Sequence, residues 1–386
     1  MMGCNLIFTR ISSYVDEFIF SPLGLRRYWQ DMVFNWKRLF GFAQYDVLGL
    51  DIGTSSVRMV QLAKDDNGNF SVVAAGISDI EDNPADNAAR EANMVKAVQR
   101  CLASGRTSTR MTVCGVTGPE VAVRHFKFPP LQPEELEGAI RLEASQVCPF
   151  NVDDGVVEYQ LIQNGDTDGS ANGVLVAATN DVIRRKLSVV EKCSLDCVLM
   201  DVDGLALLNC LCESKKSGGQ IGSSAILDVG ASCTTLAVMS ENNMPFVRTV
   251  HYAGNDIVKQ IAEENKVSPE LVKRDIYGTT RPTIPAENLG PSLERACEKL
   301  VSDVTETLRY HSAQAKTVAI EQILVCGGFG MIKGFVDILN RKLPVRAILW
   351  NPFDSMRCSV GRQCLDVIQS NGPAMAVAAG LAMRSV

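Results

Sequence analysis

The strongest constraint on the fold is a pattern that occurs twice in the chain. Residues 47–62 and 225–240 each contain an apolar strand, then Asp-x-Gly, then small residues, mostly hydroxylic, then a second apolar strand. This pattern predicts a β-hairpin whose turn is small and polar. The aspartates Asp51 and Asp228 hold corresponding positions in the two copies. We therefore expect a tandem duplication of one α/β domain.

A pair of such turns is suited to binding a polyphosphate from both sides. Small residues let backbone N–H groups approach an anion closely and form a nest for phosphate oxygens. Hydroxyl groups add donors, and an arginine on the outgoing strand adds a fixed cation. Aspartates at the strand ends, Asp51 and Asp228, can hold Mg²⁺ through water, because this ion keeps much of its hydration shell. The candidate phosphate-binding residues are Gly53, Thr54, Ser55, Ser56 and Arg58 in the first copy and Gly230, Ala231, Ser232 and Thr234 in the second.

A third element follows the second hairpin. Residues 323–330 are typical of a buried strand that ends in a glycine-rich turn, and we expect a helix over 331–342. Glycines at a helix N-terminus let a flat adenosine lie against the backbone. Such a turn also occurs as a simple strand-to-helix connection, but its order after the two hairpins favours a nucleotide site. The candidate adenosine-binding residues are Gly327, Gly328 and Gly330.

The remaining pattern alternates strands and helices, as α/β proteins do. A Ser/Gly/Lys-rich linker at 214–224 marks the border between the two halves. We expect strands at 112–116, 122–126 and 173–179. We expect helices at 133–147, 181–192, 204–212, 255–264, 268–277 and 292–314, with a proline-containing loop before the last of them.

Composition limits the class of protein. With 386 residues, 46% of them hydrophobic, the chain can bury a sizeable core in two or three domain-sized units. No uncharged apolar run approaches the ~20 residues that span a bilayer, and no secretory signal is visible. A net charge of -6 gives no reason to expect nucleic-acid binding. The 13 cysteines lack paired spacing, which favours reduced thiols in a cytoplasmic protein, and the three histidines share no motif with a metal or triad partner.

The N-terminal segment has a composition of its own. Of the 24 aromatic residues, 11 fall in the first 45 positions. Apolar side chains there recur at helical spacing, and Arg26, Arg27, Lys37 and Arg38 take much of the opposite face. Tryptophan and arginine on such helices suit a membrane interface, so residues 1–40 are a candidate membrane contact. A helical pair packed on the protein or on a partner explains the pattern equally well, and the first 31 residues are also explained by a misjudged start codon.

The motifs together resemble those of the actin, heat-shock chaperone and sugar kinase superfamily. The first hairpin carries LDIGTSSVR, the second LDVGASCTT, and the glycine turn VCGGFG. Residues 202–207 and 372–380 resemble the two helices that connect the halves in these proteins. From about Phe34 to the C-terminus, the chain is most similar to the PilM type of pilus assembly protein, a relative of FtsA, and residues 138–150 are characteristic of that type.

This resemblance implies a fold and a function. The fold is α/β and actin-like, a ribonuclease H-like duplicated two-domain arrangement with a nucleotide cleft and an FtsA/PilM-type 1C subdomain. PilM-type proteins bind ATP with Mg²⁺ at the cytoplasmic face of the inner membrane. They hold the short N-terminal peptide of the membrane protein PilN in a groove near 1C. The chain departs from the usual pattern at Arg58, where lysine is usual, at Cys148, where isoleucine is common, and at Cys233, where serine is common.

The same resemblance predicts a division of the chain. Residues 1–44 form the aromatic extension, 45–111 subdomain 1A, 112–195 a 1C-like subdomain and 196–222 a connecting helix and linker. Residues 223–254 form subdomain 2A, 255–315 a 2B-like subdomain, and 316–386 the rest of 2A with the second connecting helix.

Whether such a protein hydrolyses ATP depends on one acidic position. In filament-forming relatives a glutamate at the start of the first connecting helix orients the attacking water, and Asp203 matches that position. Asp203 is equally well explained as the cap of its helix. We expect any hydrolysis to be slow and ATP to act as a conformational switch. The alternatives are a filament-forming, self-associating ATPase like FtsA and, less favoured, a small-molecule kinase of the superfamily. The sequence leaves open which machine the protein serves, a type IV pilus or a related secretion system.

Overall fold

The computed structural model describes most of the chain after the N-terminal extension. The described residues are 47–65, 68–81, 86–162, 170–216, 223–240, 244–278, 282–314, 319–358 and 361–384. The extension at 1–44, with its candidate membrane contact at 1–40, lies outside them. Within the described residues, no helix has both the length and the apolar character needed to cross a bilayer.

Two sheets repeat one topology. In the first half the order is β14-β3-β2-β1-β4-β8, and in the second it is β11-β10-β9-β12-β13. In each half the first two strands along the chain form an antiparallel hairpin. The first strand of that hairpin also pairs in parallel with a later strand. The predicted duplication is therefore confirmed. The first sheet contains β1 (Leu48–Ile52), β2 (Ser56–Lys64), β3 (Phe70–Asp79), β4 (Met111–Val116), β8 (Asp196–Val202) and β14 (Arg357–Cys358). The second contains β9 (Ser224–Val229), β10 (Thr234–Met239), β11 (Pro245–Val250), β12 (Gln322–Cys326) and β13 (Arg346–Leu349).

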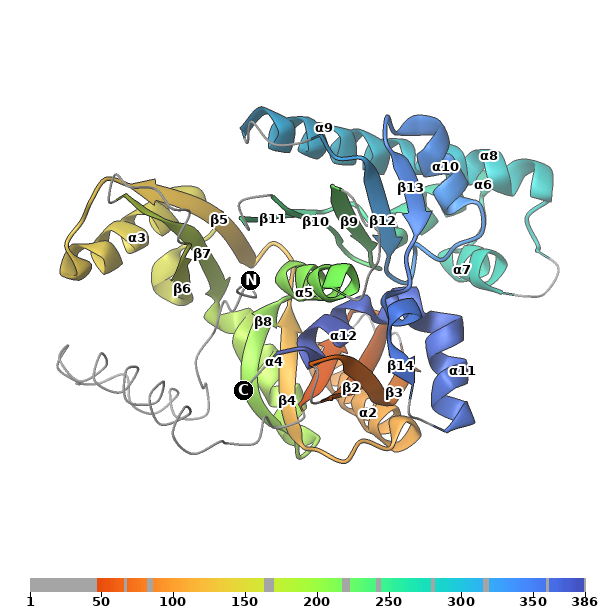
Figure 1. The fold of residues 1–386 in the computed structure, drawn as a ribbon. Helices are drawn as coiled ribbons and strands as arrows, with labels where there is room; N and C mark the ends of the chain where they lie inside the picture. Colours follow the sequence, from red (N-terminus) through yellow and green to blue (C-terminus); the bar gives the residue numbers. More distant parts are fainter. Residues whose placement is uncertain are drawn as a thin grey trace.

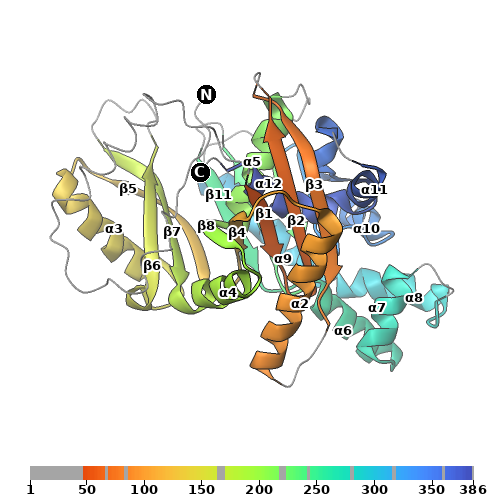
Figure 2. The same ribbon diagram turned by 90° about the horizontal axis from the view of Figure 1, so that it is seen from below.

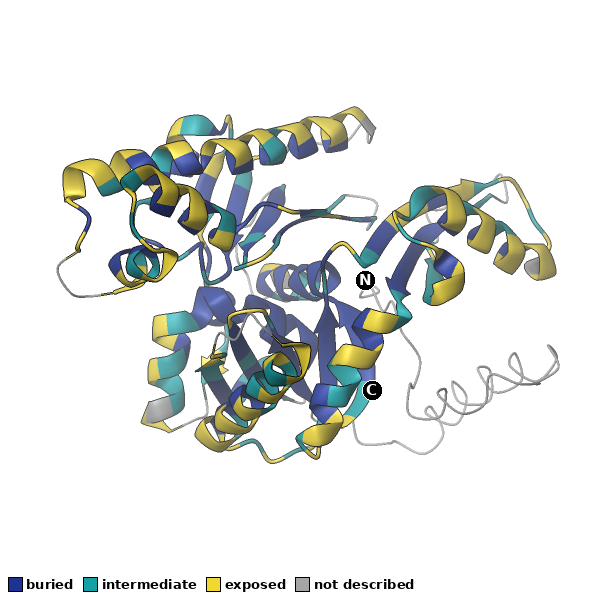
Figure 3. Cartoon of the chain, turned by 180° about the vertical axis from the view of Figure 1, so that it is seen from behind, coloured by how far each residue is buried: buried dark blue, intermediate teal, exposed yellow. Residues whose placement is uncertain are grey.

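Two buried helices lie between the sheets (Figures 1 and 3). Helix α12 (Ala376–Ala382) packs on β1 and β2, α5 (Asp203–Lys216) packs on β10 and β11, and the two helices pack on each other. Their approach requires a residue without a side chain, because a Cβ on Gly380 would lie 1.9 Å from the Ala206 carbonyl oxygen. The short η3 (Pro352–Ser355) and η4 (Gly372–Met375) complete this connection.

Other helices cover the outer faces of the sheets. Helices α2 (Asn87–Gly105) and α4 (Asn180–Lys192) lie against the first sheet, on the face opposite α12 (Figure 2). The second half carries α6 (Gly254–Asn265), α7 (Pro269–Tyr277), α8 (Ala286–Ala296), α9 (Glu298–Gln314) and α10 (Phe335–Lys342). Helix α11 (Arg362–Asn371) packs beside β3.

A third, smaller sheet projects from the body (Figure 1). Its order is β5-β7-β6, with β5 (Val121–Phe128), β6 (Gly155–Leu161) and β7 (Ala171–Thr179). Helix α3 (Pro133–Val147) and the short η2 (Val152–Asp154) pack against it. The six buried residues of its separate core are Phe126, Leu136, Ile140, Ala144, Val152 and Leu175. This sheet lies within the segment 112–195 for which a 1C-like subdomain is predicted, whereas β4 of that segment pairs in the first large sheet.

Two helix predictions were wrong at their boundaries. The predicted helix at 292–314 is two helices, separated at Cys297, and α8 already begins at Ala286 with Pro291 inside it. Its buried face, with Leu293 and Ala296, offsets the unfavourable proline. The helix predicted at 331–342 begins only at Phe335, because Gly334 has a left-handed φ of 82° that interrupts helical geometry.

Candidate functional site

The two predicted hairpins end in turns of the same geometry. In the first turn the Gly53 N–H donates to the Ser56 carbonyl oxygen at 3.0 Å. In the second, the Gly230 N–H donates to the Cys233 carbonyl oxygen at 3.1 Å. Each closing bond leaves the intervening small residues at the tip of the turn. The tips are exposed at Thr54, Ser55 and Ser232 and half-buried at Ala231.

The two turns meet across the molecule. The Thr54 hydroxyl donates a hydrogen bond of 3.1 Å to the Ser232 hydroxyl. One residue belongs to the first half of the chain and the other to the second, so this contact joins the tips of the duplicated hairpins. The structure therefore brings together the two sets of candidate phosphate-binding residues, which the sequence places far apart.

Three carboxylates gather behind these turns. Asp51 is the last residue but one of β1, Asp228 is the last residue but one of β9, and Asp203 begins α5. Burial, followed by the negative charge of Asp51, raises the pKa of Asp228 to about 6. Burial, followed by the charges of Asp51, Asp228 and Asp201, raises the pKa of Asp203 well above its usual value. The shifts show that these carboxylates lie close enough to repel one another.

Asp203 also has a buried side-chain oxygen that lacks a hydrogen-bond partner. Only 6% of the residue is exposed, and its Oδ1 has no hydrogen-bond partner. Burying a polar oxygen without a partner costs free energy, so such atoms mark places where a water, ion or ligand completes the structure. Among the described residues, no three histidine, cysteine or acidic side chains converge tightly enough to hold a metal directly. Water-mediated binding of Mg²⁺ by Asp51 and Asp228 stays a prediction.

Two cations face the carboxylates. Arg58 Nη1 lies 2.9 Å from Asp51 Oδ2, and both side chains are nearly buried. The other end of the Arg58 guanidinium reaches the second half, because a Cβ on Gly328 would lie 3.3 Å from Nη2. The second cation is Lys186 of α4, whose Nζ donates to the Ile52 carbonyl oxygen at the end of β1.

Sequence reasoning missed Lys186. The sequence predicted only a helix over 181–192 at this position. Its spacing carried a signal, since Lys186 stands four residues after Val182 and three before Val189, both buried. A lysine on the apolar face of a helix points toward the protein, where it requires an acidic or anionic partner.

The glycine turn lies beside the second hairpin. Gly327 has a φ of 86°, and a Cβ there would lie 2.3 Å from Asp228 Oδ1. The Phe329 N–H donates to the Val229 carbonyl oxygen at 3.0 Å, which ties the turn to β9. Tyr277, at the end of α7, is 53% exposed, and its ring stands edge-on to the Phe329 ring. An aromatic ring thus stands beside the predicted adenosine-binding turn.

Not every predicted residue lies at the exposed tips of the turns. Thr234 is fully buried, and its hydroxyl donates to the Tyr252 carbonyl oxygen at 2.9 Å. Ser56 is buried as well. Gly330 supports the glycine turn, because a Cβ there would lie 2.5 Å from the Cys326 carbonyl oxygen. These residues shape the turns, whereas Thr54, Ser55 and Ser232 are the predicted residues with hydroxyls at the exposed tips.

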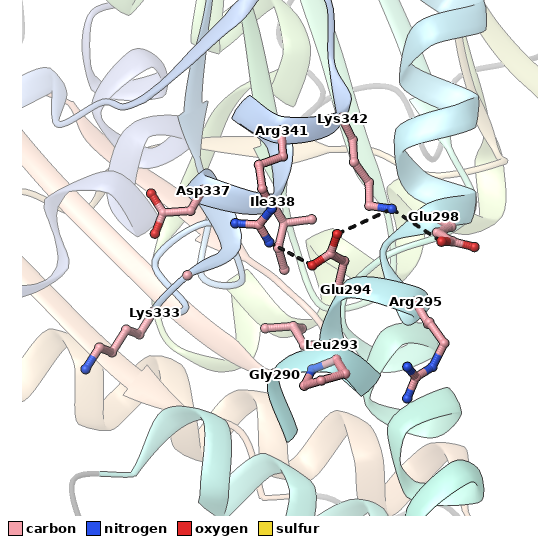
Figure 4. Close-up of a pocket in the computed structure, with 12 residues that line it drawn as sticks. Gly290, Leu293, Glu294, Arg295, Glu298, Lys333, Asp337, Ile338, Arg341 and Lys342 are labelled. Carbon is pink, nitrogen blue, oxygen red and sulfur yellow. Dashed lines mark hydrogen bonds and ion pairs between the residues drawn. The ribbon is translucent and has the colours of Figure 1, made fainter. Parts of the chain in front are cut away.

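A separate cavity of about 530 Å³ lies between α8, α9 and α10 (Figure 4). Its wall contains paired charges: Arg341 lies 2.8 Å from Glu294, and Lys342 lies 3.6 Å from Glu294 and 3.3 Å from Glu298. None of the residues that line it belongs to the hairpin turns or the glycine turn. The cavity is therefore distinct from the predicted site.

The duplicated sheets, the paired central helices and the meeting hairpin turns define an actin-like two-domain fold. Comparison with known families identifies a family within this class of actin-like proteins. Over residues 49–386 the chain matches the family described as type IV pilus assembly protein PilM, and it belongs to that family. It is thus an actin-like protein of the type IV pilus system.

Solved structures agree on the fold. The chain is similar to the structure of a PilM–PilN type IV pilus biogenesis complex, with a TM-score of 0.75 and 21% identity over 89% of this chain and 99% of that one. It is also similar to the ethanolamine utilization protein EutJ from Carboxydothermus hydrogenoformans, with a TM-score of 0.51 and 12% identity over 89% of this chain and 90% of that one. A glycerol dehydratase reactivase matches with a TM-score of 0.50 and 12% identity over 87% of this chain and 99% of that one.

Proposed function

We propose that the cleft between the hairpin turns binds ATP with Mg²⁺. The observation that carries this proposal is the convergence of Asp51, Asp203 and Asp228 behind two hairpin turns that touch at Thr54 and Ser232. Backbone N–H groups at the tips of the turns are suited to phosphate oxygens. In the glycine turn Gly327 is buried, so the half-buried Gly328 is the glycine that would lie against the adenosine.

The electrostatics of the cleft fit a divalent cation. Asp51, Asp203 and Asp228 lie together behind the hairpin turns. Among the described residues, Arg58 and Lys186 are the cations that lower the pKa values of Asp228 and Asp203. Bound Mg²⁺ supplies positive charge that relieves the repulsion between carboxylates and neutralises phosphate oxygens. The unpartnered Asp203 Oδ1 is suited to accept a hydrogen bond from a water. Asp203 would then orient a water toward the terminal phosphate, and we expect this hydrolysis to be slow.

We further propose that ATP acts as a conformational switch. Helices α5 and α12 connect the halves, and α5 begins at Asp203, beside the cleft. A ligand that contacts both hairpin turns changes the angle between the halves only if it binds one angle more tightly. We therefore propose that the central helix pair carries the switch.

The partner we propose is the N-terminal peptide of a PilN-like inner-membrane protein, bound at the small third sheet. Two large apolar side chains are exposed there, Leu142 on α3 at 61% and Leu161 on β6 at 47%. β6 is an edge strand of its sheet, and an open edge accepts an extended peptide. The solved PilM–PilN complex supports a partner of this kind. Such binding would hold the protein at the cytoplasmic face of the inner membrane.

Thermal unfolding with and without Mg-ATP tests the nucleotide site. We expect Mg-ATP to raise the melting temperature of the natural protein, because a ligand that binds only the folded state stabilises it. Asp51→Ala combined with Asp228→Ala should abolish this shift. Asp153→Ala combined with Asp337→Ala, two exposed carboxylates outside the hairpin turns and the glycine turn, is the matched control and should keep it. An unchanged shift in the first double variant would contradict the assignment of the site.

A further inference from the structure

We propose that Lys186 is a phosphate ligand that couples the nucleotide cleft to the small third sheet. The proposal rests on the proposed nucleotide site and adds a residue from a helix outside the three predicted motifs. It is carried by the position of Lys186, by the hydrogen bond it makes and by the connections of its helix.

The position of Lys186 is set by α4. The buried residues Val182 and Val189 share its face of the helix, so the lysine stem packs inward. The ammonium extends to the end of β1 in the first sheet. There Nζ donates to the carbonyl oxygen of Ile52, the residue immediately before Gly53 of the first turn. The ammonium therefore lies at the base of a predicted phosphate-binding turn.

The charge of Lys186 acts on both halves of the cleft. It lowers the pKa of Asp203, against the larger effect of burial. It also acts to lower the pKa of Cys233 in the second turn, where burial raises that pKa overall. A single ammonium that acts on both groups lies near the meeting point of the two turns.

The Lys186 ammonium has hydrogen-bond donors that its bond to Ile52 does not use. An ammonium has three donors, and the bond to Ile52 occupies one of them. Within the described residues Lys186 has no carboxylate within ion-pair distance, whereas Arg58 is paired with Asp51. A polyphosphate would add several negative charges beside it. Because lysine is a compact charge on a flexible stem, Nζ can turn from the carbonyl oxygen to a phosphate oxygen.

The other end of α4 joins the third sheet. Thr179, the last residue of β7, caps α4 by accepting a hydrogen bond from the Val182 N–H. Arg185, next to Lys186, pairs with Glu120 directly before β5. A contact between Lys186 and a phosphate would therefore hold a helix that continues without a break from the central strand of that sheet. Occupancy of the cleft would in this way reach the sheet on which we place the partner peptide.

Binding measurements with truncated nucleotides test the phosphate contact. We expect Lys186→Gln to weaken Mg-ATP binding about tenfold, or about 1.4 kcal/mol, while the affinity for adenosine changes less than twofold. Lys192→Gln, at an exposed position in the same helix, is the matched control and should leave both affinities unchanged. Lys186→Arg retains the charge and should retain more of the ATP affinity than Lys186→Gln.

The outcomes separate this proposal from the nucleotide site itself. If the natural protein does not bind Mg-ATP, the proposed function fails and this inference fails with it. If it binds but Lys186→Gln matches Lys192→Gln, the site stands and the role of Lys186 is wrong. An equal loss of ATP and adenosine affinity would also overturn the proposal, because it would indicate general damage to the fold. Should Lys186→Gln fail to fold, the same comparison is made with Lys186→Met, which keeps the apolar stem and removes the charge, and an ATP-to-adenosine affinity ratio within twofold of the natural one would overturn the phosphate contact.

Hydrogen exchange tests the coupling. Saturating Mg-ATP should change amide exchange in β6 and β7 of the natural protein and of Lys192→Gln. The change should be lost in Lys186→Gln at a nucleotide concentration raised to saturate that variant. An equal change in both variants, or none in the natural protein, would show that Lys186 does not transmit occupancy to the sheet.

Discussion

Arg384 Nε lies 2.5 Å from Asp201 Oδ2, and both side chains are almost fully buried, at 4% and 1% exposure. This ion pair joins the residues after α12 to the end of β8, two positions before Asp203. The other oxygen of Asp201 accepts a hydrogen bond from the Val202 N–H at 2.8 Å. The pair thus ties the second connecting helix to the start of the first, beside the carboxylates of the cleft.

Removing one partner of this pair should destabilise the protein strongly. Arg384→Ala leaves the Asp201 carboxylate buried without its cation, which typically costs about 3–5 kcal/mol. Urea unfolding of Arg384→Ala measures the loss, and Arg309→Ala, an exposed arginine of α9, provides the control with a change of less than about 0.5 kcal/mol. A loss as small as the control's would mean that water reaches Asp201 and replaces the arginine.

Two glycines should respond to alanine in opposite directions. Gly327 has a positive φ, and a Cβ there would meet Asp228 and the Val229 carbonyl oxygen, so Gly327→Ala should destabilise the fold and remove the Mg-ATP shift. Gly290 lies within α8 with no atom within 4 Å of its Cβ position, so Gly290→Ala should stabilise by up to about 1 kcal/mol. Thermal unfolding of both variants checks the pair. A Gly327→Ala variant as stable as the natural protein would contradict the geometry of the turn.

The features that were predictable from the sequence are those encoded within a short segment. The hairpin turns and the glycine turn can be recognised in the sequence, because the local backbone geometry requires their residue types. Helix α3 matched its prediction of 133–147, since a proline, two glutamates and an apolar stripe all lie within it. The spacing of Lys186 indicated a lysine that faces the protein, but not which groups it meets, because its neighbours in space come from β1 and from the second half. The break at Cys297 was missed because the apolar stripe continues across it.

The alternative explanation of Asp203 as a helix cap illustrates the same limit. A capping aspartate is recognised by its bond to a backbone N–H, and sequence alone cannot tell such a residue from one that faces a cleft. The structure places Asp203 as the first residue of α5 with Oδ1 unpartnered and three other carboxylates acting on it. Two of these carboxylates, Asp51 and Asp228, come from parts of the chain far from Asp203 in sequence. They favour a role in the cleft over a purely local one.

The raised pKa of Asp228 predicts how stability depends on pH. An aspartate with an ordinary pKa of 3.8 in the unfolded chain and a pKa of about 6 in the folded protein binds more protons when folded. Stability should therefore be greatest below pH 3.8, as far as this group is concerned, and fall as the pH rises to about 6. Asp228→Asn removes this cost, so it should raise the free energy of unfolding at pH 7 by up to about 3 kcal/mol and much less at pH 4.

Urea unfolding at both pH values, without nucleotide, measures this effect. Asp153→Asn is the control, because that carboxylate is exposed and should give no difference between the two pH values. If Asp228→Asn changes stability equally at pH 4 and pH 7, the effect comes from lost packing and not from the ionised carboxylate.

Asp203 should limit turnover but not binding. Its carboxylate is the residue that we expect to orient water at the terminal phosphate, and burial, with the nearby carboxylates, raises its pKa well above the usual value and so disfavours its ionised form. We therefore expect phosphate release by the purified protein to be slower than about one per second, the low end of typical enzyme rates. Asp203→Asn should lower this rate further while Mg-ATP still raises the melting temperature. A fast turnover that is abolished in Asp203→Ala with binding intact would instead make the protein an efficient ATPase, and the slow-switch proposal would be wrong.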